Sequence, residues 1–191
     1  MITRTTLIYP STMATNATIY KAQLQIADMD RRYFRDHALT LARHPSETDE
    51  RLMVRVLAFA LHADDALSFG RGVVTEDEPA LWQRDLTGVI DLWIEIGQPD
   101  EKTLRRACGR AKQVVVYSYG ARDAEAWWAD QRASFDRLRN LSVTLLPMEQ
   151  VRALAEMASP SMQLQWTIQD GHVWIAGGTQ TLHLELQRLK S

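Results

Sequence analysis

Apolar and polar residues alternate without a break along residues 89–96. One set of alternate positions holds four large aliphatic residues, Ile90, Leu92, Ile94 and Ile96. The other set consists of Val89, Asp91, Trp93 and Glu95. A period of two residues is that of a β-strand with one face on a core. We therefore predict a strand that buries the aliphatic set, carries two carboxylates on its opposite face, and ends at Gly97-Gln98-Pro99.

The N-terminal part of the chain has the pattern of a β-hairpin followed by a helix. Residues 17–27 alternate, residues 33–43 form a second extended run, and the two are predicted to pair as antiparallel strands. The sequence His44-Pro45-Ser46-Glu47 is typical of a helix start with Ser46 as the N-cap, so we predict a helix over residues 47–65. Short extended pieces are predicted after it, at residues 67–74 and 80–85.

The remaining pattern alternates between helices and strands. Residues 100–112 have a helical pattern and residues 113–119 are nearly all apolar, so with residues 89–96 they predict a parallel strand–helix–strand crossover. Further helices are predicted at residues 121–138 and 147–158, and further strands at 141–146, 163–169, 172–176 and 181–189. Asp170-Gly171 is a hairpin signal between two of these strands. Together these elements predict an α/β (α+β) fold with a mixed β-sheet.

Length and composition predict one domain with a substantial core. The chain has 191 residues, and its hydrophobic content of 46% is ordinary for a globular protein. Residues 1–12 do not share the pattern of the rest of the chain, and the sequence from Met13 resembles a natural start. We predict a loosely ordered extension over residues 1–12 and a single domain over residues 13–191.

Charge and cysteine content narrow the classes of function. The net charge of −2 and the isoelectric point near 6.2 disfavour strong nonspecific binding to nucleic acid. The single cysteine, Cys108, excludes an internal disulfide and a cysteine-rich zinc site, and it suits a reducing compartment. No apolar run approaches the roughly 20 residues of a membrane span. We predict a cytoplasmic protein with no membrane partner.

Five stretches of the chain resemble a known protein family, in the same order. They are Ala17-Thr-Ile-Tyr-Lys, Leu39-Thr-Leu-Ala-Arg-His-Pro-Ser-Glu-Thr, Ile90-Asp-Leu-Trp-Ile-Glu-Ile-Gly, Pro99-Asp-Glu and Thr167-Ile-Gln-Asp-Gly. They make the chain from Met13 onward similar to the YaeQ family. The resemblance implies a PD-(D/E)XK nuclease-like, or restriction-endonuclease-like, core of helix, three strands, helix and strand, here with an added N-terminal hairpin and C-terminal strands. It implies no established activity, although the family's naming associates it with transcription.

The resemblance also implies acidic ligands for Mg²⁺ or Mn²⁺. In the nuclease superfamily an aspartate on one core strand and an acid on the next bind the ion, and a glutamate of the first helix assists. The positions that match these acids are Glu50, Asp85, Asp91 and Glu95. Glu95 matches the acid of the third strand, and Asp85 and Asp91 are alternatives for the preceding aspartate. About 13 Å of strand separates the Cα atoms of Asp91 and Glu95, too far to share one ion without a bend.

Glu50 has two interpretations. Its helical phase places it on the same side as Met53 and Leu57, where an unpaired carboxylate is costly to bury. Glu50 therefore either points into a site, or extends to solvent from the start of the helix or pairs with an arginine such as Arg43 or Arg51.

The nuclease pattern has a lysine two residues after the acid of the third strand. In this chain that position, two residues after Glu95, is Gly97. Lys21, on the polar face of the first predicted strand, is the better chemical substitute because arginine stays protonated. The alternative interpretation is that Lys21 is only a solvated strand residue. Other cations that could substitute lie on the following helix: Lys102, Arg105 and Arg106.

The sequence supports two hypotheses for the function. The first is a Mg²⁺- or Mn²⁺-dependent phosphodiesterase acting on nucleic acid, with the catalytic side chains Glu50, Asp91, Glu95 and Lys21. The second is a binding or regulatory protein that keeps the nuclease architecture without turnover and meets a protein or nucleic-acid partner, with a link to transcription. Further candidates for lining the pocket are Arg43, Glu47 and Gln98.

Overall fold

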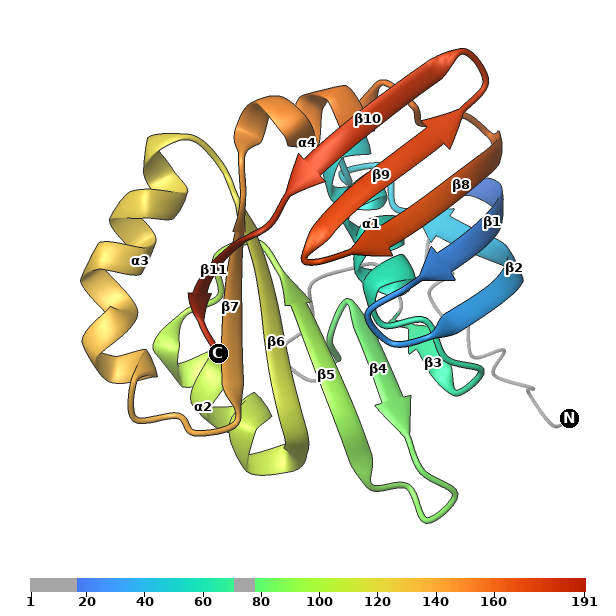
Figure 1. Ribbon diagram of the computed structural model, residues 1–191. Coiled ribbons are helices and arrows are strands. Elements are labelled where there is room, and N and C mark those ends of the chain that lie inside the picture. The colour runs from blue at the N-terminus through green and yellow to red at the C-terminus, as the bar shows by residue number, and fades with distance from the viewer. Residues whose placement is uncertain (1–16, 71–77) are drawn as a thin grey trace, which may run out of the picture.

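The structure is a computed structural model that describes residues 17–70 and 78–191. The extension predicted at residues 1–12 lies outside the described residues, as does the second half of the strand predicted at residues 67–74. The described residues form a mixed α+β fold with two mixed sheets and four helices (Figure 1).

The five-stranded sheet joins the two ends of the described chain. Its strand order is β10-β9-β8-β1-β2. The strands are β1 (Thr18–Asp28), β2 (Tyr33–Arg43), β8 (Ser161–Gln169), β9 (His172–Gly177) and β10 (Gln180–Glu185). β1 pairs with β2 in the antiparallel hairpin that the sequence predicts, and on its other side β1 pairs in parallel with β8.

The six-stranded sheet contains the strand that the unbroken alternation of residues 89–96 predicts. Its order is β11-β7-β6-β5-β4-β3. The strands are β3 (Leu67–Phe69), β4 (Leu81–Arg84), β5 (Ile90–Ile96), β6 (Ala111–Tyr119), β7 (Leu141–Leu146) and β11 (Gln187–Lys190). β5, β6 and β7 are parallel, which confirms the predicted crossover from β5 through a helix to β6.

The helices fill two separate cores on either side of the six-stranded sheet (Figure 1). They are α1 (Asp49–Leu61), α2 (Glu101–Arg110), α3 (Arg122–Phe135) and α4 (Met148–Ala155). α1 lies between the two sheets, and every residue from 52 to 60 is buried. α2 and α3 cover the opposite face of the six-stranded sheet. None of the described helices is long and apolar enough to cross a membrane.

The prediction of one mixed sheet is wrong, because the N-terminal hairpin and most of the C-terminal strands form a sheet of their own. The strand predicted at residues 181–189 is also wrong as one element. It is divided at Leu186, so that β10 pairs with β9 in one sheet and β11 pairs with β7 in the other. Both differences depend on pairing between segments far apart in the sequence, which local alternation does not specify.

The predicted start and end of α1 are also corrected. Ser46 does not cap the helix, because its hydroxyl lies 2.6 Å from Nδ1 of His44 in the preceding turn. Thr48 is the N-cap instead, and its Oγ1 accepts a hydrogen bond from the amide of Arg51 at 3.3 Å. The helix ends at Leu61 with His62 as the C-cap, four residues before the predicted end.

The alternation in β5 holds from Leu92 onward but not at Ile90. Leu92, Ile94 and Ile96 pack in the core that surrounds α1, as predicted. Ile90 packs instead with Trp93 in the core beneath α2 and α3. The cause is an irregularity in the pairing of β4 with β5, which shifts the register next to Asp91.

Candidate functional site

The parallel strands β5 and β6 end at the same edge of the six-stranded sheet, next to the N-terminus of α1. Across this edge the amide of Gly97 donates to the carbonyl of Tyr117 at 3.0 Å, and the side chain of Gln98 donates to the carbonyl of Tyr119 at 3.0 Å. We call this region the carboxyl edge: residues 47–51, 95–98 and 119. The ends of parallel strands are where open α/β sheets bind ligands.

A buried ion pair anchors the start of α1 at this edge. Nη1 of Arg55 lies 2.9 and 3.0 Å from the two carboxylate oxygens of Glu47. Both side chains are only 2% exposed. Glu47 is thus paired inside the core. It was predicted as a pocket-lining residue, but its side chain supports the pocket wall from within the core.

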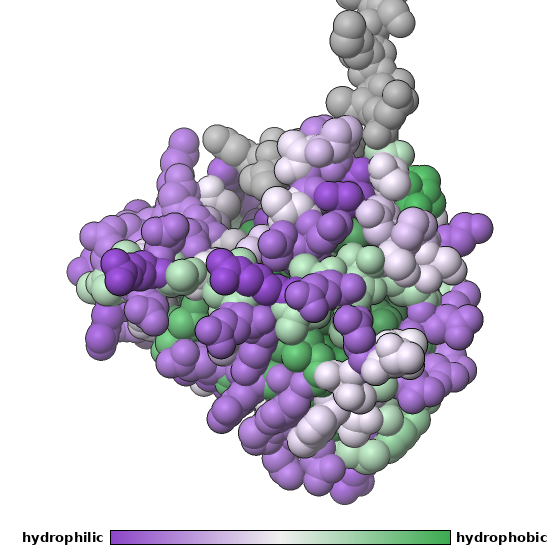
Figure 2. Space-filling model, turned by 90° about the horizontal axis from the view of Figure 1, so that it is seen from above, coloured by the Kyte–Doolittle hydropathy of each residue, from purple (hydrophilic) through white to green (hydrophobic). Residues whose placement is uncertain are grey.

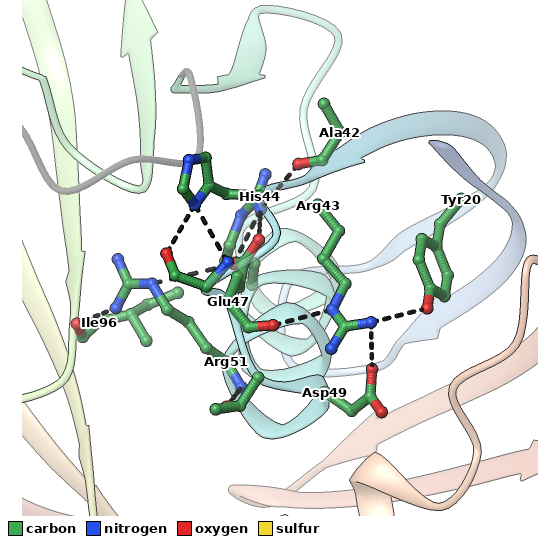
Figure 3. Close-up of polar contacts among 11 residues, drawn as sticks. Tyr20, Ala42, Arg43, His44, Glu47, Asp49, Arg51 and Ile96 are labelled. Atoms are coloured by element: carbon green, nitrogen blue, oxygen red, sulfur yellow. Dashed lines mark hydrogen bonds and ion pairs between the residues drawn. The ribbon is translucent and has the colours of Figure 1, made fainter. Parts of the chain in front are cut away.

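Arg43 ties the end of β2 to the same turn (Figure 3). Its Nε donates to the backbone carbonyl of Glu47 at 2.9 Å, and its Nη1 donates to the hydroxyl of Tyr20 at 3.2 Å. The same Nη1 lies 3.4 Å from Oδ1 of Asp49. Arg43 therefore fixes the position of the α1 N-terminus against the five-stranded sheet.

Arg51 spans the gap between α1 and the end of β5 (Figure 3). Its Nη1 donates to the carbonyl of Ile96 at 2.7 Å, and its Nε lies 3.8 Å from the carboxylate of Glu47. A Cβ built on Gly97 would meet Nη1 of Arg51 at 3.9 Å. The φ of Gly97 is +105°, a conformation that residues with a side chain rarely adopt. The cation next to position 97 is therefore supplied by α1 and not by β5.

Glu95 is a buried carboxylate on the face of β5 that also carries Trp93. Nε1 of Trp93 donates to its Oε1 at 2.8 Å. Burial raises the pKa of Glu95, while the Trp93 hydrogen bond and the Arg51 charge oppose the rise. A buried acid with a shifted pKa at a strand end is a candidate functional group.

Glu50 is half-buried at the same edge, near the hydroxyl of Tyr119. Burial raises the pKa of Tyr119, Arg51 opposes the rise, and the charges of Glu50 and Glu47 add to it. The predicted pairing of Glu50 with Arg43 or Arg51 is wrong, because those arginines contact Asp49 and Glu47 instead. Within residues 17–70 and 78–191 no ion pair of Glu50 is formed.

Asp85 and Asp91 belong to the other end of β5. Oδ1 of Asp85 accepts hydrogen bonds from the amide and hydroxyl of Thr87 and from the amide of Val89, at 2.6–3.0 Å. The Thr87 hydroxyl is the main reason that the pKa of Asp85 is lowered. Oδ1 of Asp91 pairs with Nζ of Lys112 at 2.6 Å. Asp85 therefore stabilises the turn between β4 and β5, and Asp91 links β5 to β6.

The predicted substitute lysine lies away from the carboxyl edge. Lys21 is exposed on the outer face of the five-stranded sheet, between Thr40 of β2 and Ser161 of β8. On α2, Arg105 pairs with Glu101 of its own helix and Lys102 is exposed.

The four predicted metal ligands therefore do not meet. Glu50 and Glu95 lie at the carboxyl edge, whereas Asp85 and Asp91 lie at the opposite end of β5. In the described part of the chain, no group of three or more His, Cys, Asp or Glu side chains is arranged to hold a metal ion. A Mg²⁺ or Mn²⁺ centre built from Glu50, Glu95 and either Asp85 or Asp91 does not fit this arrangement.

Of the residues at this edge, the sequence predicts Glu47, Glu50, Glu95 and Gln98 as site candidates but not Arg51 or Tyr119, and Arg43, also predicted, contacts the edge from the end of β2. The spacing of four residues between Glu47 and Arg51, one turn of helix, was the available signal for Arg51. Tyr119 gave no such signal, because a tyrosine at the end of an apolar strand is most often a packing residue.

The fold and this edge define a mixed α+β protein in which a central helix, enclosed by two sheets, directs its N-terminus to the ends of parallel strands. The family model described as YaeQ protein matches residues 13–186. The chain belongs to the YaeQ family.

Relatives and solved structures support this assignment over almost the whole chain. Two relatives are each named as an uncharacterised protein YaeQ, from Salmonella typhi (47% identical) and Escherichia coli K12 (45% identical). Each match covers 91% of this chain and 96% of the relative. The crystal structure of YaeQ from Xanthomonas axonopodis pv. citri is 48% identical, with a TM-score of 0.89 over 92% of this chain and 99% of that one. The crystal structure of the Pseudomonas syringae YaeQ protein is 32% identical, with a TM-score of 0.89 over 93% and 98% of the two chains.

Proposed function

We propose that α1, β3, β4, β5, α2 and β6 form a nuclease-like core to which a second sheet has been added. The chain order of helix, three strands, helix and strand supports this proposal. The pairing supports it as well, since β3, β4 and β5 are antiparallel and β6 is parallel to β5. Within this core the carboxyl edge occupies the end of the third core strand.

On this core we infer a binding or regulatory protein without metal-dependent turnover. The observation that carries the inference is the position of Arg51 at the end of β5, where its Nη1 donates to the carbonyl of Ile96 and its charge opposes the rise in the pKa of Glu95. Arg51 stays protonated, so it offsets the charge of Glu95 but is a poor acceptor of a proton from water. Asp85 and Asp91, which would complete an acidic centre, are engaged at the other end of β5.

The chemistry of the carboxyl edge favours a protein partner over nucleic acid. Acidic and basic groups are paired at it, Asp49 with Arg43 and Glu47 with Arg51. This edge therefore lacks the positive surplus that phosphate backbones require. The strands β5 and β6 run upward in Figure 1, so their ends lie toward the top of that view. Figure 2 shows the molecule from above. This face is covered mostly by hydrophilic residues, with apolar residues in patches between them. Mixed polar and apolar surface is typical of interfaces between proteins that also exist apart.

Site-specific photocrosslinking in bacterial cells tests this function. A photoreactive amino acid replaces Gln98, which is exposed at the carboxyl edge, or Gln163, which is exposed on the outer face of the five-stranded sheet. We expect a discrete protein adduct from position 98 and none from position 163. Adding Arg51→Gln should reduce the adduct by about tenfold or more, since the variant loses a charged hydrogen-bond donor.

Arg105→Gln is the matched control, because Arg105 pairs with Glu101 on the exposed side of α2. That variant should leave the adduct unchanged. An adduct that contains nucleic acid, or one that forms equally at both positions, contradicts the proposed function.

A metal-dependent phosphodiesterase is the second candidate, and Glu95 is the observation that favours it. A buried carboxylate on a central strand is destabilising unless it is paired, and such groups are often retained for function. Mg²⁺ is commonly held by one or two protein carboxylates together with substrate phosphates. This candidate therefore requires divalent-metal binding that depends on Glu95, with Glu50 as the second carboxylate.

A further inference from the structure

A cavity of about 260 Å³ lies between the C-terminal end of α1 and the inner face of the six-stranded sheet. It is at the opposite end of α1 from the carboxyl edge, because its wall contains the C-cap residue of that helix. The polar side chains of its wall include His62, Tyr117, Ser142, Thr144, Arg188 and Lys190. They come from α1, β6, β7 and β11, so four elements converge on one hollow.

His62 and Tyr117 form a preset polar contact in its wall. Nε2 of His62 lies 2.8 Å from the hydroxyl oxygen of Tyr117. Burial lowers the pKa of His62 to about 4 and raises the pKa of Tyr117, so both groups are neutral at physiological pH. When Nε2 carries the ring proton, His62 donates to Tyr117, and the tyrosine hydroxyl hydrogen is free to donate into the cavity.

β7 adds two hydroxyl groups to the wall of the cavity. Thr144 is only 8% exposed, and Ser142 precedes it by two residues on the same face of the strand. Neither side chain makes a hydrogen bond to another part of the described chain. Both hydroxyl groups are therefore open to a hydrogen bond with water or a ligand.

β11 adds two cations. Arg188 pairs in register with Thr144, and its charge acts on the hydroxyl of Tyr117. In residues 17–70 and 78–191, neither Arg188 nor Lys190 forms an ion pair. The charge of Asp28 acts on His62, and Asp28 is itself paired with Arg31 at 2.6 Å. The terminal residue Ser191 also lines the cavity, and within the described residues neither cation is paired with an acid.

We propose that this cavity binds a phosphate group, either as free phosphate or as the terminal group of a small phosphomonoester. Two cations and up to three hydroxyl donors, arriving from different strands, match an anion whose acceptor oxygens point in several directions. A planar carboxylate would leave donors on one side unsatisfied. The site is separate from the carboxyl edge and does not depend on its function.

Titration with inorganic phosphate, followed by NMR at constant ionic strength, tests the proposal. We expect saturable shifts of the amides of Tyr117, Thr144 and Arg188. Arg188→Gln and Thr144→Val should each weaken phosphate binding, the first by about tenfold or more because it removes a charged donor. Arg139→Gln, an exposed arginine on the loop after α3, is the control and should bind phosphate like the wild type.

Two further ligands distinguish the sources of the phosphate group. Glycerol 1-phosphate that binds more tightly than inorganic phosphate assigns the site to a phosphomonoester, and the reverse order assigns it to free phosphate. Acetate should bind at least about tenfold more weakly than either. Equal binding by wild type and Arg188→Gln, or no saturable shift with either phosphate ligand, overturns the proposal. Arg188 is exposed, so its replacement leaves the fold intact, and the amide spectrum of the variant checks this.

Discussion

Replacing Arg55 with leucine lowers the free energy of unfolding by about 3–5 kcal/mol, because it leaves the carboxylate of Glu47 buried without its partner. The side chains of both residues are 2% exposed, so water cannot replace the guanidinium. Arg51 offers little compensation, since its Nε lies 3.8 Å from Glu47 and its Nη1 is engaged with the carbonyl of Ile96. Urea denaturation followed by circular dichroism measures the loss.

The control for this variant is Arg105→Leu, which removes an exposed ion pair of α2. Its loss should be at most about 1 kcal/mol. Combining Arg55→Leu with Glu47→Gln should recover part of the stability, because no uncompensated charge is then buried. A loss below about 1 kcal/mol for Arg55→Leu alone would contradict the role of this pair in anchoring α1.

Leu57→Ala should cost about 2–5 kcal/mol, with a value in the upper half of that range. Leu57 is fully buried in α1, and sheets enclose this helix on both sides, so its surroundings have little freedom to close the cavity that the substitution leaves. Thermal or urea unfolding of the purified variant measures the loss.

Leu86→Ala is the matched control, since Leu86 is fully exposed in the β4–β5 turn. Its effect should stay within about 0.5 kcal/mol. If Leu57→Ala were equally mild, α1 would not be the centre of the larger core.

Much of the local structure follows from the sequence. Alternation predicted the β1–β2 hairpin, and the change from strand to helical periodicity predicted the β5–α2–β6 unit. The second sheet could not be predicted this way, because β1 pairs with β8 across more than 130 residues and no local pattern records that pairing. The division of the C-terminal run at Leu186 has the same origin, since it depends on which sheet each half joins.

The candidate site was predictable only in part. Glu95 and Gln98 follow from the end of the strand, but the phase of a helix cannot locate Glu50 when residues 52–60 are buried on every side. Strand spacing correctly separated Asp91 from Glu95. The position of Arg51 across the gap left by Gly97 depends on how α1 packs between two sheets, which the sequence does not reveal.

The central claim is that the carboxyl edge is a binding surface in which Arg51, and no divalent ion, offsets the charge of Glu95. Calorimetric titration of Mn²⁺ into the wild type and into Glu95→Gln tests it most directly. Glutamine keeps an oxygen that accepts the hydrogen bond from Trp93, so the variant preserves the local structure. We predict that the two proteins give the same isotherm, without a saturable site that depends on Glu95. A saturable site in the wild type that is lost in Glu95→Gln would contradict the claim and favour the metal-dependent phosphodiesterase.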